Sequence, residues 1–369
     1  MTDELASWIG MSAFPGIGPV RFKLLYDYFG SAKAAWEANS RALRAIKLPS
    51  TLIQELVAFR KTWDANEYIG RLAELHVHVL TLNDPKYPKL LKQIPDAPFL
   101  LYVKGRRTDT PLNLDKTIAV VGTRKITPYG REVTRQLVGE LVSYGFTIVS
   151  GLAYGVDAAA HQAALDAGGK TIAVLGCGID IIAPPSNARL YADIAGGGGA
   201  IVSEMPLGHR PMKGLFPARN RIISGLSLGV VVTEGADDSG ALITARNAGE
   251  QGREVFAVPG PITSRYSAGP AKLLKNGAKL VERVEDIIDE LGMELIKKKG
   301  HLPGDPPMRR GDTKEEQKIL DTLADGPMHI DQLARSTSLT MQTVGATITI
   351  LEMKGIVKDY GEKVYGLCN

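Results

Sequence analysis

The chain has 369 residues, a length that suits two or three domains with full hydrophobic cores. Hydrophobic residues make up 44% and charged residues 23%, no apolar run is long enough to cross a bilayer, and the net charge of +4 is too small to indicate a polyanionic partner by itself. The N-terminus lacks the pattern of a secretory signal and only Cys177 and Cys368 are present, so we expect a cytoplasmic protein without a membrane segment, a disulfide framework or a structural zinc.

Residues 1–75 are predicted to form an N-terminal helical domain. Phe14–Pro19 carries two glycines and precedes an amphipathic stretch over 20–29, which resembles a helix-hairpin-helix element. Glycines permit a tight turn whose amide groups can meet a phosphate, but the same turn also occurs in helical packing units without a ligand. Both alternatives stay open.

Residues 76–292 are predicted to form an α/β domain, because short apolar runs alternate with helical stretches. Such alternation is typical of an extended Rossmann-like, doubly wound and mostly parallel sheet, whose ligands bind beyond the carboxyl ends of the strands. The expected strands are 117–121, 147–150, 171–175, 200–203, 229–233 and 254–258, and the expected helices are 129–143, 156–167, 219–226 and 240–251.

Residues 293–313 are rich in Lys, Pro and Gly and are predicted to be a linker. Residues 314–369 follow, with three helical stretches near 314–324, 329–336 and 340–353 and two short strands within 356–365. Three helices and a β-hairpin predict a winged-helix domain.

Three glycine-containing turns follow successive predicted strands. The first is Gly122-Thr123-Arg124, the second is Ser150–Asp157, and the third is Leu175–Gly178. Together they predict one groove with exposed amides, in which Arg124 adds a bidentate donor for an anion. We interpret Asp157 as the cap of its helix and Cys177 as a packed residue.

The most informative stretch is 205–221, which holds four Arg or Lys side chains, one His and no acidic residue. Arg219, Asn220 and Arg221 fall at a predicted helix start, where arginines are unfavourable for the helix dipole but would suit a phosphate ligand. Phe216 lies among the charges and offers a face on which a base could stack. A solvated basic loop is the alternative.

A small-residue turn over 235–245 follows the strand 229–233 and also suits an anion at the same edge. Asp237 and Asp238 are adjacent, so their side chains point apart, and no third ligand is evident. We therefore expect neither a metal site nor a cofactor.

These segments together resemble the DNA-processing protein A family (DprA, also called Smf). The resemblance covers about 76–292, and its flanking pieces are similar to the family's N-terminal helical and C-terminal winged-helix additions. The residues that carry it are Gly122–Arg124, Ser150–Asp157, Phe216–Ser224, Ser239–Ala245 and Val258–Gly260.

The resemblance implies a non-catalytic homodimer that binds and protects single-stranded DNA and loads the RecA recombinase onto it during natural transformation. It implies a DNA groove lined by Gly122, Thr123, Arg124, Lys213, Phe216, Arg219, Asn220 and Arg221. It also implies more peripheral phosphate contacts at Arg253 and Lys275.

Two other functions were weighed. The core also resembles nucleotide N-glycoside hydrolases of the lysine-decarboxylase-like group, but the stretch 239–244 lacks their glutamate, and Glu204 and Glu234 are the obvious substitutes. A transcription factor is disfavoured, because the helix predicted over 340–353 contains no Lys or Arg. Val344, Ile348 and Ile350 on that helix suggest a protein contact instead, although some of them must form its core.

Overall fold

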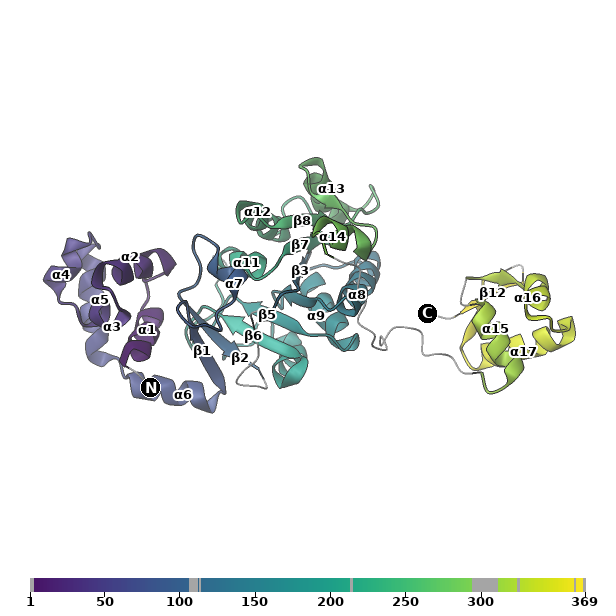
Figure 1. Cartoon of the computed structure of the whole chain (residues 1–369), viewed down its shortest axis with the longest axis horizontal. Coiled ribbons are helices and arrows are strands. Elements are labelled where there is room, and N and C mark those ends of the chain that lie inside the picture. Colours follow the sequence, from purple (N-terminus) through teal and green to yellow (C-terminus); the bar gives the residue numbers. More distant parts are fainter. Residues whose placement is uncertain are drawn as a thin grey trace. The chain divides into compact units, whose positions relative to one another are not determined.

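The structure of the chain is a computed structural model. It describes residues 3–105, 112, 114–212, 215–293, 311–323, 326–361 and 363–367. The chain divides into two units, 1–300 and 301–369 (Figure 1). The four-part division at 75, 292 and 313 therefore stays a prediction, and most of the expected linker lies outside the described residues.

A mixed sheet forms the centre of the first unit. Its strands, as far as they are described, run in the order β1-β2-β6-β5-β4-β3-β7-β8-β9. All neighbours from β6 to β9 are parallel, whereas β1 pairs antiparallel with β2 and β2 pairs antiparallel with β6. The strands are β1 Val77–Thr81, β2 Leu100–Lys104, β3 Thr117–Val121, β4 Thr147–Ser150, β5 Thr171–Leu175, β6 Gly199–Ser203, β7 Gly229–Val232, β8 Glu254–Ala257 and β9 Lys279–Leu280.

Helices cover both faces of this sheet because side chains alternate along each strand. In β3, Ile118 and Val120 pack against one helical layer, while Ala119 and Val121 pack against the other. The first layer contains α8 Pro128–Ser143, α9 Val156–Asp166 and α14 Val284–Glu290. The second contains α7 Lys89–Lys92, α11 Leu215–Gly225 and α12 Ala241–Glu250. The doubly wound, mostly parallel fold is thus confirmed.

Two further helices of this unit are α10 Ala188–Asp193 and α13 Ala268–Lys275. The 3-10 turn η1 Pro185–Asn187 leads directly into α10. Among the helices of the described segments, none is long and apolar enough to span a membrane.

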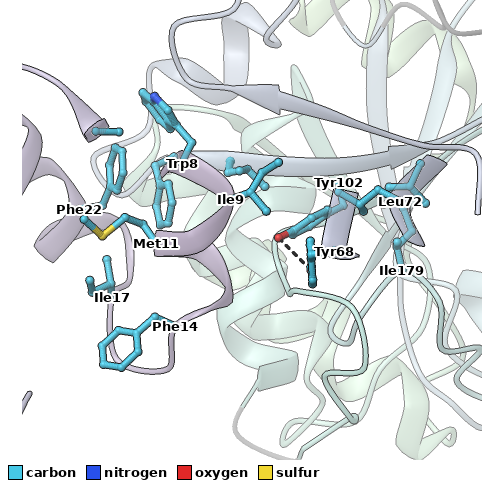
Figure 2. Packing of buried hydrophobic residues seen from close by; sticks show 14 of the residues in the cluster. Trp8, Ile9, Met11, Phe14, Ile17, Phe22, Tyr68, Leu72, Tyr102 and Ile179 are labelled. Atoms are coloured by element: carbon cyan, nitrogen blue, oxygen red, sulfur yellow. Dashed lines mark hydrogen bonds between the residues drawn. The ribbon is translucent and has the colours of Figure 1, made fainter. Parts of the chain in front are cut away.

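The N-terminal helices share one hydrophobic cluster with the sheet. Figure 2 shows this packing, in which Trp8 and Phe22 lie 4.5 Å apart between ring centroids and Phe22 stacks on Phe99 at 4.0 Å. The helices are α1 Asp3–Ala13, α2 Pro19–Phe29, α3 Ala32–Glu37, α4 Ser40–Ala45, α5 Ser50–Thr62 and α6 Ala65–Glu74. Because aromatic residues bury large areas, this contact ties the helices firmly to the sheet.

The predicted hairpin turn lies between α1 and α2. Gly16 has a φ of +103°, and an added Cβ would lie 2.7 Å from Leu52 Cδ1, so this turn requires glycine. The Arg21 guanidinium donates to the Gly16 carbonyl at 2.6 Å. The turn is thereby explained by packing, and its phosphate-binding alternative stays open.

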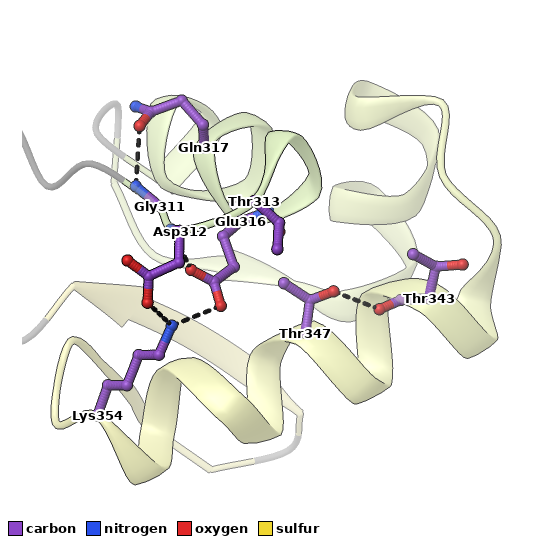
Figure 3. Close-up of polar contacts among 8 residues, drawn as sticks. All are labelled: Gly311, Asp312, Thr313, Glu316, Gln317, Thr343, Thr347 and Lys354. Atoms are coloured by element: carbon purple, nitrogen blue, oxygen red, sulfur yellow. Dashed lines mark hydrogen bonds and ion pairs between the residues drawn. The ribbon is translucent and has the colours of Figure 1, made fainter.

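The second unit is the expected winged helix, with one more strand than predicted. Its elements are α15 Lys314–Leu323, β10 Met328–His329, α16 Ile330–Thr337, α17 Met341–Met353, β11 Val357–Asp359 and β12 Val364–Leu367. Lys354 joins the end of α17 to the segment before α15, because its ammonium contacts Asp312 and Glu316 at 2.7 Å each (Figure 3). Val344 and Ile348 are buried in the core, so only Ile350 of the three suggested contact residues is exposed.

Candidate nucleic-acid interface

A cavity opens at the point where the direction of strand addition reverses. From β3 the chain proceeds through α8 to β4 on one side, whereas from β7 it proceeds through α12 to β8 on the other. Such a reversal leaves a crevice beyond the carboxyl ends of the two central strands. A cavity of about 430 Å³ lies there, a size typical of sites for small ligands. We call it the switch-point cavity.

The switch-point cavity combines cations with apolar walls. Arg124 and Lys125 come from the loop after β3, and Arg265 comes from the segment after β8. Arg265 pairs with Asp238 at 3.7 Å, but both side chains are about three-quarters exposed, at 73% and 75%. Exposed pairs of this kind contribute little, so a phosphate could replace the carboxylate. Apolar walls come from Ile223, Ala236, Ala241 and Ile243.

Gly122 and Thr123 shape the rim of the cavity. A Cβ on Gly122 would lie 2.6 Å from both the Glu234 carbonyl oxygen and Val156 Cγ2, so glycine is needed for packing. Thr123 N donates to the Glu234 carbonyl at 2.7 Å, and the Thr123 carbonyl accepts from Val156 N at 3.1 Å. This turn connects the first two glycine-containing loops and leaves Arg124 exposed. The amides of Thr123 and Val156, however, are bonded within the protein rather than exposed as predicted.

Arg219 lines the same cavity as Arg124, yet its guanidinium is buried below the rim. Only 5% of Arg219 is exposed, and its Nη1 donates to the carbonyls of Gly151, at 2.6 Å, and Val174. Because α11 begins at Leu215, Arg219 lies in its second turn rather than at the predicted helix start, so the dipole argument does not apply to it. Its described partners are main-chain carbonyls rather than a phosphate.

The buried carboxyl of Asp157 interacts electrostatically with the Arg219 guanidinium. Burial raises the pKa of Asp157, while Arg219 and the amide of Ala153, 3.3 Å away, oppose that rise. Burial also lowers the pKa of Arg219. Asp157 does not cap its helix, because Gly155 occupies the N-cap position without a side-chain hydrogen bond. The expected capping role was wrong, since the carboxylate holds the preceding loop.

Asn220 and Arg221 occupy different surroundings. Asn220 is buried at the cavity wall, where its Nδ2 donates to the Gly240 carbonyl at 3.3 Å. Arg221 does not line the cavity: its guanidinium pairs with Glu204 at 2.6 Å and with Asp96 at 3.0 Å. These ion pairs correct the expectation that Arg221 faces a DNA groove, because they occupy its charge in a site where only 12% of the side chain is exposed.

Of the remaining predicted residues, Arg253 and Lys275 do not line the cavity. Lys213 and the side chain of Phe216 lie outside the described residues. Arg253 donates to the Leu90 carbonyl at 2.9 Å, and Lys275 is exposed in the last turn of α13. The peripheral roles of Arg253 and Lys275 therefore remain predictions.

The two carboxylates considered for catalysis both have structural partners. Glu234 accepts from Thr127 N at 2.9 Å and from Thr127 Oγ1 at 2.6 Å at the start of α8, and Glu204 pairs with Arg221. Within the described segments, no group of three or more His, Cys, Asp or Glu could hold a metal ion.

Sequence reasoning missed Lys125 and Arg265 as cavity residues. Lys125 could have been found because it follows Arg124 in the same turn. Arg265 could not, because it lies after β8 and reaches the cavity only through the fold.

Comparison with known proteins gives consistent matches along the chain. The family model for "DNA recombination-mediator protein A" matches residues 78–292, and that for the "DprA winged helix domain" matches residues 303–360. Protein Smf of Synechocystis is 36% identical over an alignment 385 positions long, which covers 96% of this chain and 96% of the relative. The DNA processing protein DprA of Streptococcus pneumoniae is 46% identical over 211 residues, which cover 56% of this chain and 72% of the relative.

Two solved structures resemble the fold. That of DprA from Streptococcus pneumoniae has a TM-score of 0.67 at 34% identity and covers 80% of this chain and 99% of that one. That of DNA processing protein A from Helicobacter pylori, described for its single-stranded DNA binding mode, has a TM-score of 0.53 at 34% identity. It covers 59% of this chain and 97% of that one.

Proposed function

Because this chain belongs to the DNA recombination-mediator protein A (DprA/Smf) family, we propose that it binds single-stranded DNA at the switch-point cavity. The observation that carries the proposal is the placement of Arg124, Lys125 and Arg265 around one apolar-walled cavity at the sheet edge. The single-stranded DNA binding mode described for the Helicobacter pylori relative supports the same ligand.

The cavity suits one unpaired nucleotide of a strand better than a duplex. Its cations can neutralise phosphates, and Ile243, which is 37% exposed, offers apolar surface to a base that is not stacked in a helix. A base in a duplex would have to leave its stack before it could enter, which costs a few kcal/mol. Preference for single strands is the expected consequence.

We further propose that the protein acts in the cytoplasm as a homodimer that delivers the bound strand to RecA. The recombination-mediator description of the family supports this role. Light scattering of the free protein tests the dimer, and a RecA filament-assembly assay on bound strands tests the delivery. A monomer, or filament assembly at the same rate without the protein, would contradict the respective part.

Nucleotide hydrolysis is not favoured as a second function. Glu204 and Glu234 are both held in hydrogen bonds or ion pairs near the sheet edge. Glycoside cleavage requires a carboxylate that is available to the reacting sugar. Release of free base from a nucleoside monophosphate would contradict this view.

The test is a comparison of single-stranded with duplex oligonucleotides by fluorescence anisotropy at several salt concentrations. We expect tighter binding of the single strand and an affinity that falls as salt rises, because cations at the site displace counterions from the phosphates. Arg124→Glu and Arg265→Glu should each weaken single-strand binding by roughly tenfold or more. Arg41→Glu on α4, far along the chain from the cavity, is the control for altered charge. Equal affinity for both nucleic acids, or for all variants, would overturn the proposal.

A further inference from the structure

A second cavity adjoins the first on the other side of the loop after β3. Its volume is about 580 Å³, and it shares Arg124 and Lys125 with the switch-point cavity. Its other walls come from α8, from the loop before α9 together with the start of that helix, and from η1 and α10. We call it the α10 groove. The two cavities thus lie one after the other along the sheet edge, with a pair of cations between them.

The α10 groove is strongly cationic. Arg124, Lys125, Arg131 and Arg189 all line it, and the described lining residues include no Asp or Glu. Arg189 contacts Asp193 one turn later at 3.9 Å, but 95% of the arginine side chain is exposed. An exposed pair at that distance contributes little to stability and leaves the arginine able to contact a ligand. The cations come from three separate elements, so they surround the groove.

Tyr154 provides an aromatic face beside these charges. It is half exposed, at 50%, and lines the groove. The backbone on both sides of it is fixed. Asn187 Nδ2 donates to the Leu152 carbonyl at 2.9 Å, and a Cβ on Gly155, whose φ is +77°, would lie 2.2 Å from the Thr123 carbonyl oxygen.

We propose that the α10 groove binds the nucleotides that follow the one in the switch-point cavity, with phosphates at Arg131 and Arg189 and a base stacked on Tyr154. This proposal rests on the single-stranded DNA binding proposed above. A tyrosine whose loop is already held in place loses little conformational freedom when a base stacks on it. Because Arg124 and Lys125 belong to both cavities, a continuous strand can pass from one to the other without leaving the cationic surface.

The experiment compares variants at residues that line only the α10 groove. The double variant Arg131→Glu with Arg189→Glu should bind an oligonucleotide of about 20 nucleotides at least tenfold more weakly than wild type does. The slope of log affinity against log salt concentration should fall in magnitude by about 1.4, because each phosphate contact on a single strand contributes about 0.7. Tyr154→Ala should weaken binding by roughly 5- to 100-fold. Tyr154→Phe retains the ring and should bind as wild type does.

The matched control is Arg41→Glu with Arg44→Glu on α4, which changes the net charge equally. Arg131, Tyr154 and Arg189 are exposed, so the variants should fold, and thermal unfolding checks this. Wild-type protein that fails to bind single strands would refute the proposed function itself. If wild type binds but the groove variants bind equally well with the same salt slope, the function stands and the α10 groove proposal is wrong.

Discussion

His161 illustrates how a single buried side chain supports the loop beneath the binding edge. Leu152 N donates to its Nε2 at 3.3 Å, and Thr171 Oγ1, which itself donates to the Ile148 carbonyl at 2.8 Å, lies 2.6 Å from Nδ1. The ring must therefore carry its proton on Nδ1 and remain neutral. Burial, with a contribution from Arg219, lowers the pKa of His161 to about 3.

This pKa makes stability depend on pH. Between about 6.5 and about 3 the unfolded chain binds a proton at His161 that the folded chain does not, so stability falls as the pH falls through this window. From about pH 7 to about pH 5 we expect this residue to remove about 2 kcal/mol from the free energy of unfolding.

Asp157 and Glu204 oppose this trend, because their folded-state pKa values are raised and they stabilise the fold less as the pH rises. The measurement is therefore urea unfolding of wild type and His161→Gln across that range, where the difference between the two isolates the histidine. Parallel curves would contradict the prediction.

Arg219 shows why part of the site could not be predicted from the sequence. The basic run predicted a helix start at residues 219–221, but α11 begins at Leu215. The described partners of Arg219 are the carbonyl of Gly151, just after β4, and that of Val174, within β5, and both lie far from Arg219 in the sequence. The ion pairs of Arg221 could not be predicted either, because Asp96 and Glu204 come close to it only in the folded molecule. Arg124 was predictable because a strand-to-helix turn places it at the edge regardless of distant contacts.

At the scale of elements, hydroxyl groups link the N-terminal helices to the strand edge. The Tyr102 hydroxyl of β2 lies 3.3 Å from the Tyr68 hydroxyl of α6 (Figure 2). It also lies 3.1 Å from the Ser12 hydroxyl of α1. Tyr68 Oη in turn accepts from Leu207 N at 2.7 Å, in the segment that begins the basic stretch. These bonds join three elements through groups that water reaches poorly.

Tyr68→Phe should therefore lower the free energy of unfolding by about 1–3 kcal/mol, because it leaves the Leu207 amide without its acceptor. Chemical denaturation measures the change. Tyr28→Phe, on a side chain that is 57% exposed, serves as the control and should stay within about 0.5 kcal/mol of wild type. An unchanged Tyr68→Phe protein would show that water replaces the lost hydroxyl.

Some strands could be predicted from the sequence and others could not. Strands β3 and β5 are buried at every position, so their continuous apolar runs identified them. Strands β1, β2 and β9 were missed. Most residues of β1 are only partly buried and it includes His78, and the two residues of β9 carry no periodic pattern. Strand β2 was missed although its first four residues form a buried apolar run. Antiparallel pairing at the β1 edge likewise leaves no signal in the local sequence, because it depends on which strand lies next to β6 in the folded sheet.

At the scale of the whole molecule, the two units have separate hydrophobic cores. The cluster of the winged helix contains no residue from before Ile319, and both cavities lie within residues 121–266. Its helix α17 carries no Lys or Arg, so it offers no cationic side chain to phosphates from the position that usually enters a DNA groove.

We therefore expect a protein that ends after Gly300 to bind single-stranded DNA within about threefold of the full chain, because the phosphate contacts are retained. Anisotropy titration of both proteins under the same salt conditions measures this. The isolated second unit, at the same concentration, should bind neither strand nor duplex appreciably. A tenfold loss on removal of residues 301–369 would instead assign a direct DNA contact to the winged helix.

The register of β2 against β6 has a consequence during protein synthesis. Tyr102 pairs with Ser203, so the partner of β2 is translated about a hundred residues after β2 itself. At about 5–20 residues per second, a ribosome needs roughly 5–20 s to supply it. During that interval the nascent antiparallel pair of β1 and β2 presents an open edge of backbone groups to solvent. Chaperone capture of ribosome-bound chains should accordingly be strongest before β6 emerges from the exit tunnel.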